Sequence, residues 1–401
     1  MSDILLKAKE ALLMSQNVST LLQEIIVLEE EAGGYYVSPT GNDANSGLIN
    51  SPWKTIQKAA DNVNPGDRVH IMPGTYFERV LLKISGTSDA YIKFISDNAT
   101  LDGTGIDLYA ARKALFDTNG KSFVVIEGLR VINADYFGIG DMAGETSGGH
   151  DIIVRNCRTY NTGSSGIAFF WGASMTISNN VVEYSNTRST QEAISLHGIQ
   201  GFTINGNEVF NGLMEGIDCK GGSSNGKIFD NYVHDLVAGP YKMNGIYIDA
   251  YDREGSNIEV YNNLVERCGN GIIVAAENNG SCHDIYIHNN TIKFCRAGFN
   301  VSGWGIGSTH MVHDIIFDHN EIYGASDNAI TFSNASAINI RLTNNRLGGQ
   351  YTYTDAIEMT NKVTSVDPSV FIDGNALCKL GTKPTALNGT NYTILPALDV
   401  P

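Results

Sequence analysis

An asparagine recurs after short apolar strands along most of this chain, and this repeat restricts the fold more than any other feature. The repeated positions are Asn156, Asn180, Asn207, Asn231, Asn263, Asn290, Asn320, Asn345 and Asn375. Neighbouring members lie 24 to 32 residues apart, so the repeat unit varies in length. Each unit contains two pieces in which apolar and polar residues alternate, such as MTISNNVVEY and NGIYIDA. Such alternation is typical of half-buried strands.

The repeat predicts an all-β solenoid, a parallel β-helix in which each unit forms one coil, about ten in all. Apolar residues would stack inside, and hydrogen bonds would run between coils. Asparagine suits the sharp corner of a coil because it tolerates left-handed backbone angles. The alternative is an all-β sandwich with chance periodicity, which nine registered asparagines disfavour.

The amino-acid composition of the chain limits the kinds of molecule that we expect it to bind. The net charge of −16 disfavours nucleic acid, which binds clustered Lys and Arg. A polyanionic substrate would be repelled unless a metal or local cations intervened, whereas a neutral substrate meets no such barrier. The six cysteines show no CxxC spacing, so we expect free core thiols. No apolar stretch reaches about 18 residues, so no membrane span is expected.

Residues 35–80 contain a strand, a turn rich in Gly and Asn, a helix from about Trp53 to Asn62, and a strand that ends in PGTY. This stretch resembles the N-terminal part of right-handed parallel β-helix enzymes of the pectate-lyase-like superfamily, which includes polysaccharide lyases and glycoside hydrolases. The resemblance implies right-handed coils, and the helix would cap the first coil. We therefore predict a β-helix catalytic domain over 35–380 and a C-terminal tail over 381–401.

The segment before residue 35 has a different pattern. Its seam positions are Ile4, Lys7, Ala11, Met14, Val18, Leu21, Ile25 and Leu28. This heptad spacing predicts an amphipathic helix over 1–34, either packed on the β-helix or forming a coiled-coil stalk. The N-terminus lacks a basic region followed by an apolar run, so we expect no secretory signal. A stalk before a β-helix resembles phage tail spikes, which implies a homotrimer on a virion or released by lysis.

Aligning the second strands of four units on Ile194, Ile217, Ile246 and Ile272 brings polar residues to one outward face. The set comprises Glu192, His197, Glu215, Asp218, Lys220, Asp249 and Glu277, with Asp252 at its edge. Adjacent coils lie about 4.8 Å apart, so we expect one patch across four coils. Stacked like charges destabilise a sheet, which favours a functional cluster over a merely solvated acidic face.

Two of these acids lie on matching segments, Asp249 in GIYID and Glu277 in AAENNG. Carboxyl groups on adjacent coils would be roughly 5 Å apart, the spacing of a retaining glycosidase. The segment resembles β-helix glycoside hydrolases of the β-xylosidase type, although the glutamate sits about two residues further along its strand. The resemblance implies that Asp249 is the nucleophile and Glu277 the acid/base, with no cofactor.

Lys220 supports an alternative. The stretch EGIDCKGG resembles the site of β-helix polysaccharide lyases, in which a lysine removes the proton next to a uronate carboxylate. The resemblance implies calcium bound by Glu215 and Asp218. The surrounding carboxylates should raise the pKa of Lys220, which opposes its use as a base.

Aromatic side chains supply platforms for sugar rings. The candidates are Trp171, Tyr247, Tyr251 and Trp304, and we expect them to bind substrate together with Glu192, His197, Glu215 and Asp252. The expected partner is a polysaccharide or oligosaccharide. A third hypothesis is a non-enzymatic glycan-binding spike or adhesin, which would keep the aromatics but has no need of clustered acids.

The stalk hypothesis predicts that residues 1–34 set the oligomeric state. Light scattering after size exclusion should give a trimer mass for the full chain and a monomer mass for residues 35–401. An unchanged mass would reject the stalk.

Overall fold

The computed structural model describes residues 34–188, 191–236, 243–304, 311–332, 334, 337–348, 357–359, 371–377 and 388–394. The segment predicted as an amphipathic helix, 1–34, lies outside these ranges except for its last residue, so the stalk and the trimer stay predictions. Within the described residues, no helix is long and apolar enough to cross a membrane.

Three rows of strands run along the solenoid, and each coil contributes one strand to each row. The site row contains β4 (Val80–Leu81), β7 (Ala114–Asp117), β10 (Phe137–Met142), the first part of β13 (Ile167–Ser178) and of β15 (Ile194–Asn205), β17 (Ile217–Lys220), β20 (Ile246–Tyr251), β23 (Asn270–Glu277), β26 (Ala297–Trp304), β29 (Asn328–Phe332) and β32 (Ile357–Met359).

The long row receives the later part of β13 and β15. Its other members are β1 (Tyr35–Val37), β2 (Arg68–Ile71), β5 (Ile92–Ser96), β8 (Val124–Glu127), β11 (His150–Arg155), β18 (Ser224–Phe229), β21 (Glu254–Tyr261), β24 (Ser281–His288), β27 (Met311–Asp318), β30 (Ala337–Thr343), β33 (Phe371–Leu377) and β34 (Asn388–Ile394). Strand β34 falls in the segment predicted as a tail and pairs with β33.

The short row lies between the other two. Its members are β3 (Thr75–Tyr76), β6 (Thr100–Asp102), β9 (Arg130–Ile132), β12 (Arg158–Tyr160), β14 (Val181–Glu183), β16 (Glu208–Phe210), β19 (Tyr232–His234), β22 (Leu264–Glu266), β25 (Thr291–Lys293), β28 (Glu321–Tyr323) and β31 (Arg346–Gly348).

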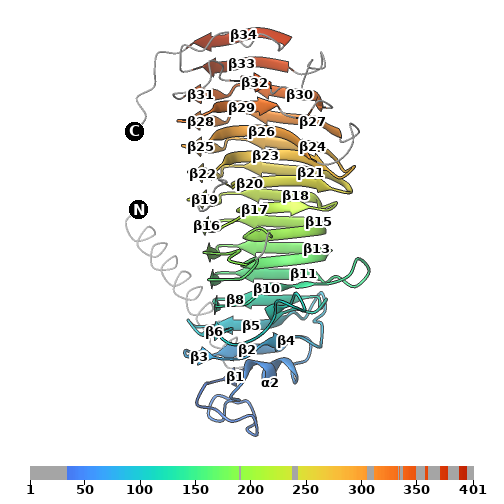
Figure 1. The fold of residues 1–401 in the computed structure, drawn as a ribbon. Coiled ribbons are helices and arrows are strands. Elements are labelled where there is room, and N and C mark those ends of the chain that lie inside the picture. The colour runs from blue at the N-terminus through green and yellow to red at the C-terminus, as the bar shows by residue number, and fades with distance from the viewer. Residues whose placement is uncertain are drawn as a thin grey trace, which may run out of the picture.

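Coils stack in chain order from the blue base to the red top (Figure 1). Strand neighbours within a row are parallel and come from successive coils, as in β17–β20–β23. The result is an all-β right-handed parallel solenoid of about ten turns, which confirms the predicted fold class. Inward side chains form one continuous core, in which aromatic rings stack between strands, as Phe299 and Phe317 do with centroids 4.3 Å apart.

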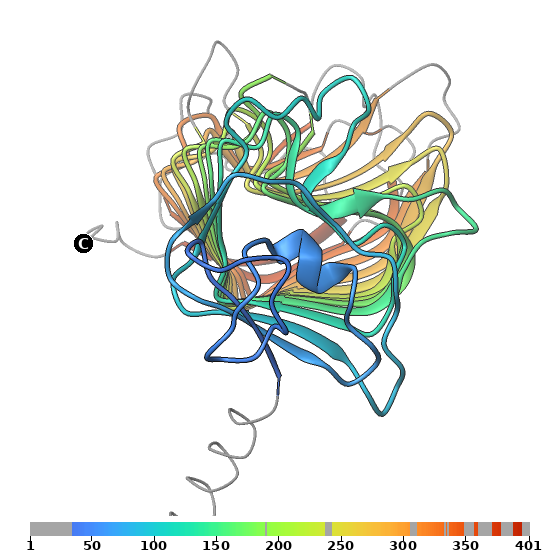
Figure 2. The same ribbon diagram turned by 90° about the horizontal axis from the view of Figure 1, so that it is seen from below.

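The single α-helix of the described residues, α2 (Ile56–Ala60), is shorter than the predicted span from Trp53 to Asn62. Thr55 caps its N-terminus by accepting from the backbone N–H of Lys58. Figure 2 shows α2 at the base of the solenoid, among the first coils. Ile56, Ala59 and Ala60 are buried. That this short helix serves as the cap of the solenoid stays a prediction.

Seven of the repeated asparagines form a buried ladder along one corner: Asn180, Asn207, Asn231, Asn263, Asn290, Asn320 and Asn345. Asn231 Nδ2 donates to the carbonyl of Ile204 and to Asn263 Oδ1, each at 2.9 Å. Its Oδ1 accepts from the N–H and the amide of Asn207. Each ladder residue therefore satisfies backbone groups that the corner would otherwise bury unpaired.

One position of the predicted repeat is wrong. Asn156 is exposed and donates to Glu127, whereas the N–H of Cys157 meets the ladder at Asn180. Asn156 occupies the preceding corner position, where φ is +55°. Two asparagines often adjoin at this corner, which explains the one-residue error. The side chain of Asn375 lies outside the described residues.

Five cysteines, namely Cys157, Cys219, Cys268, Cys282 and Cys295, are buried free thiols as expected. The sixth, Cys378, lies outside the described residues.

The ladder predicts a strong penalty for its interruption. Asn231→Ala should reduce the free energy of unfolding by about 2–4 kcal/mol, because it leaves several buried backbone and amide groups without partners. The exposed Lys227→Ala variant on the same coil should change it by less than about 1 kcal/mol. Urea denaturation of both variants measures the difference, and equal midpoints would contradict the prediction.

Candidate functional site

The candidate site lies on the outer surface of the site row, across β15, β17, β20 and β23. Alternation along each strand sends Ile217 and Cys219 into the core and leaves Asp218 and Lys220 on the opposite face. Strand register then aligns residues of successive coils. One column contains Ser195, Asp218, Tyr247 and Ile273, and a neighbouring one contains His197 and Lys220.

Lys220 is the cation at the centre of this face, with only 13% of its side chain exposed. Its Nζ lies 2.5 Å from Glu192 Oε1 and 3.6 Å from Asp218 Oδ2. Ser195 donates a hydrogen bond of 2.7 Å to the other oxygen of Glu192. The lysine thus joins the carboxylates of two adjacent coils.

The pairing between Lys220 and Glu192 favours the charged forms of both groups. Burial raises the pKa of Glu192, but the charge and hydrogen bond of Lys220 outweigh burial and hold the pKa below its ordinary value. Burial lowers the pKa of Lys220, and the charges of Glu192 and Asp218 outweigh it and raise that pKa. The ammonium group is therefore held in its protonated form.

In two other carboxyl groups of the cluster, the surroundings favour the neutral form instead of the charged form. Asp218 and Asp249 are 1% and 5% exposed, and Oδ1 of each is buried without a hydrogen-bond partner. Burial raises the pKa of Asp218 well above its usual range, and the charge of Glu192 adds to the effect. Burial likewise raises the pKa of Asp249, followed by the charge of Glu277. This environment favours the neutral, protonated form of each carboxyl group.

Asp249 and Glu277 lie on adjacent coils but not side by side. Asp249 pairs in register with Ala275, and Glu277 pairs with Tyr251, two residues further along. Ala275 is fully buried and has a small side chain.

The phenol of Tyr247 extends past Ala275 towards Glu277. The ring packs with Ile273 and Ala275 in a small apolar cluster, and its hydroxyl donates to Glu277 Oε1. Tyr247 and Glu277 approach each other from opposite sides of the Asp249–Ala275 row. After burial, the charge of Glu277 in this position is the next cause that raises the pKa of Asp249.

A second ladder flanks the cluster at the start of these strands. Asn270 donates to Asn244 at 2.6 Å, and Asn244 donates to Glu215 at 3.3 Å. Burial and then the charge of Glu192 raise the pKa of Glu215 to about 7. Glu215 is therefore the carboxyl group of the site that titrates near neutral pH.

Aromatic groups line the side of the cluster towards the N-terminus. His197 stacks on Phe170 with centroids 5.2 Å apart and meets Trp171 edge-on at 4.9 Å. Burial, and then the charge of Lys220, lowers the pKa of His197. Arg253 covers the other part of the Trp171 surface, with Cζ 4.7 Å from the ring.

The remaining predicted residues lie at the rim. Tyr251 is 39% exposed beside Glu277, and Asp252 follows it at a left-handed corner with φ of +55°. Trp304 aligns with Glu277 on the next coil, but its side chain lies outside the described residues.

Sequence reasoning missed two contributors. Ser195 stands in the column of Asp218, and this position was a signal that it could contact the acids. Arg253 lies beyond the end of β20, where no repeat pattern indicates that it covers Trp171.

Calcium takes six to eight oxygen ligands. Within the described residues, no three or more His, Cys, Asp and Glu side chains stand close enough together to hold a metal ion. Calcium binding by Glu215 and Asp218 stays a prediction of the lyase alternative.

Comparison with known proteins places this geometry in a family context. Residues 35–231 match the family model described as "Pel9A-like, right handed beta helix region". The chain has the pectate-lyase-like β-helix fold. The match spans the first part of the solenoid, up to Asn231 of the ladder, and so includes Glu192, Asp218 and Lys220 but not Asp249 or Glu277.

Two curated relatives are each 29% identical to this chain. The uncharacterized protein YwoF of Bacillus subtilis aligns over 63% of this chain and 60% of its own length. Pectate lyase PEL9 of Emericella nidulans aligns over 47% of this chain and 49% of its own length. The chain thus spans about half to three fifths of these relatives.

Among solved structures, the Family 28 exopolygalacturonase of Yersinia enterocolitica is similar with a TM-score of 0.51 and 13% identity. The superposition covers 85% of this chain and 75% of that protein. At this identity the likeness concerns the fold alone.

The cluster makes a prediction about titration. Glu192→Gln removes a negative charge near Glu215 and releases Lys220, and both changes should lower the pKa of Glu215 from about 7 towards the ordinary glutamate value. NMR of protein with ¹³C-labelled glutamate carboxyl groups would follow this titration, with Glu215→Gln to assign the signal. The distant variant Glu183→Gln is the control, and an unmoved Glu215 titration in Glu192→Gln would contradict the electrostatic coupling.

Proposed function

We propose that this chain is a retaining glycoside hydrolase that cleaves a polysaccharide or oligosaccharide, with Asp249 and Glu277 as its catalytic carboxyl groups. The observation that carries this proposal is the buried carboxyl group of Asp249, which lies one coil from Glu277. Burial and then the charge of Glu277 raise the pKa of Asp249, and Glu277 accepts a hydrogen bond from Tyr247. A pair of carboxyl groups in unlike environments is what glycosidic bond hydrolysis requires.

The environments favour a division of roles. The raised pKa of Asp249 favours its protonated form, which suits the general acid that donates a proton to the glycosidic oxygen as the bond to the anomeric carbon breaks. Glu277 accepts a hydrogen bond from the Tyr247 phenol, which orients its carboxylate, and it attacks the anomeric carbon. Water then attacks the glycosyl intermediate and gives its proton to Asp249, which frees the sugar and Glu277.

This division reverses the roles that the β-xylosidase resemblance implies. A nucleophile must be ionised, and burial of Asp249 opposes its ionisation. The two-residue offset places the two Cα atoms roughly 8 Å apart, from the spacings between and along strands. Side chains converging over Ala275 would bring the carboxyl groups to the roughly 5 Å that retention uses.

Lys220, Glu192 and Ser195 would bind sugar hydroxyl groups beside the acids. The ammonium group can donate to a hydroxyl oxygen, and Glu192 can accept from a hydroxyl. The ion pair of Lys220 and Glu192, and burial that favours the neutral forms of Asp218 and Asp249, reduce the net charge in this part of the site. This balance suits a neutral sugar better than a uronate.

The second candidate is a uronate lyase with Lys220 as the base. It is favoured by similarity to a protein named pectate lyase and by a family-model match, over residues 35–231, that contains Lys220. In such a reaction Lys220 would take the proton next to the uronate carboxylate, and the leaving oxygen would depart to give an unsaturated sugar. The raised pKa of Lys220 opposes this role unless a bound cation neutralises the neighbouring acids.

Digestion of a panel of neutral and uronate polysaccharides separates the two candidates. We expect new reducing ends without absorbance at 235 nm, unaffected by EDTA, and an initial product with retained configuration by ¹H NMR. Rising absorbance that EDTA abolishes would replace the hydrolase with the lyase. No product from any polymer would favour the glycan-binding spike.

Variants test the assigned residues. Asp249→Asn and Glu277→Gln should each reduce kcat by about 10²–10⁴-fold, because each removes one chemical group while retaining the side-chain shape. Glu254→Gln, an exposed substitution, should retain activity. Full activity in Asp249→Asn would overturn the assignment, and azide should restore turnover to Glu277→Gln if Glu277 is the nucleophile.

A further inference from the structure

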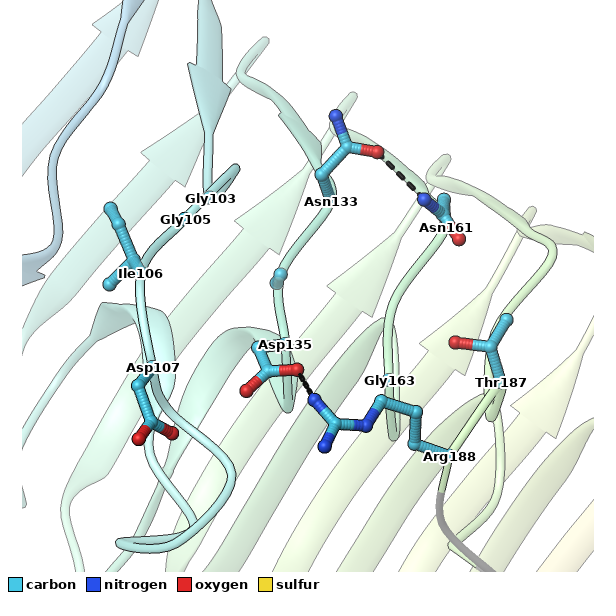
Figure 3. Close-up of a pocket in the computed structure, with 11 residues that line it drawn as sticks. Gly103, Gly105, Ile106, Asp107, Asn133, Asp135, Asn161, Gly163, Thr187 and Arg188 are labelled. Carbon is cyan, nitrogen blue, oxygen red and sulfur yellow. Dashed lines mark hydrogen bonds and ion pairs between the residues drawn. The ribbon is translucent and has the colours of Figure 1, made fainter.

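A second polar pocket lies outside the candidate site, on loops that precede the strands of the site row. It has a volume of about 450 Å³, within the range of roughly 300–1,000 Å³ common for small-molecule sites. Figure 3 shows its lining, which comes from the loops of four successive coils. The lining residues used below are Asp107, Asn133, Asp135, Asn161, Gly163 and Arg188.

The loops approach one another so closely that the pocket floor is mainly backbone. The N–H of Gly163 donates to the carbonyl of Ala134, and the N–H of Arg188 donates to the carbonyl of Gly163, each at 2.8 Å. A Cβ at Gly163 would lie 2.1 Å from the backbone oxygen of Asp135. Glycine is therefore required for the stacking of these loops, and its missing side chain keeps the floor open.

Arg188 crosses this floor. Its guanidinium forms an ion pair with Asp135, two coils away, and Figure 3 shows the side chain passing the loop of Gly163. The guanidinium also stacks on Tyr109, with Cζ 4.4 Å from the ring centroid. Two contacts thus hold the group in place, while Nε and Nη2 remain able to donate to a ligand.

Acceptors and donors face the pocket beside this cation. The Asn161 amide donates to Asn133 at 2.7 Å, which leaves Asn161 Oδ1 able to accept. Asp107 is exposed and forms no hydrogen bond or ion pair with the described residues. Two carboxylates and one guanidinium give the pocket a net charge of about −1.

We infer that this pocket is a second glycan-binding site that takes a neutral oligosaccharide segment. Sugar hydroxyl groups both donate and accept, so they match a lining of carboxylates, amides and a fixed guanidinium. The net negative charge disfavours uronate or phosphate ligands. The partly buried Ile106 in the lining provides apolar surface for a ring face.

The pocket lies near enough to the candidate site for one substrate chain to contact both. This interpretation of the substrate rests on the proposed function. Arg188 of the pocket and Glu192 of the candidate site belong to the same coil, four residues apart. The loop of Gly163 lies three coils from Asp249, or roughly 14 Å along the axis at the usual strand spacing. One polysaccharide chain along the solenoid can therefore contact both, whereas a disaccharide cannot.

Binding measured without catalysis tests the pocket by itself. Affinity electrophoresis of full-length protein in gels containing arabinoxylan, mixed-linkage β-glucan, galactan or polygalacturonate should show retardation by a neutral polymer. Asp107→Ala and Arg188→Ala should weaken that retardation at least tenfold, and the exposed Asp89→Ala should not. Asp107→Ala removes no described contact, so a folding defect cannot explain its loss of binding.

Each outcome decides one point. The glycan-binding proposal would be overturned if both pocket variants were retarded as strongly as the wild type. It would also be overturned if only polygalacturonate, or no polymer, retarded the wild type. Loss of binding in Asp107→Ala without any hydrolysis by the wild type would uphold the pocket and reject the hydrolase. Where hydrolysis is found, Asp107→Ala should raise KM on the polymer tenfold and leave kcat/KM on a short oligosaccharide unchanged.

Discussion

Parallel hydrogen bonding between coils in fixed register is the constraint on which the rest of this structure depends. It aligns each residue with its counterpart one coil away, so the polar side chains of the site row stand in columns. The asparagine ladder preserves that register at the corner, since each amide links its coil to neighbouring coils on both sides. A register slip of one residue between paired strands would separate Lys220 from Glu192 and Tyr247 from Glu277.

Stacking acids on adjacent coils carries an electrostatic cost, and the protein reduces it in two ways. Lys220 pairs with Glu192, while burial favours the neutral forms of Asp218 and Asp249. The same arrangement creates groups of different proton affinity within a few residues of one another. Relief of the repulsion and the supply of the acid that the proposed hydrolysis needs are therefore consequences of one arrangement.

Much of the fold could be predicted because the repeat and the two-residue alternation are local properties. The column of Glu215, Asn244 and Asn270 and the outward parity of Asp249 both followed from aligning strands on one aliphatic position. The ladder position of Asn156 could not be fixed, because adjacent corner residues share the same composition. The length of α2 was also predicted wrongly, since the polar residues that flank it favour helix and turn alike.

The sequence by itself determined the solenoid, the coil order and which residues share its outer face, because strand periodicity is encoded residue by residue. Only the tertiary structure decided which acids are buried, that Lys220 pairs with Glu192, and that Tyr247 spans Ala275 to reach Glu277. It also assembled the pocket of Asp107, Asp135 and Arg188 from loops without a common motif. Burial and side-chain direction depend on neighbours about 30 residues away in the chain, at the spacing of one coil.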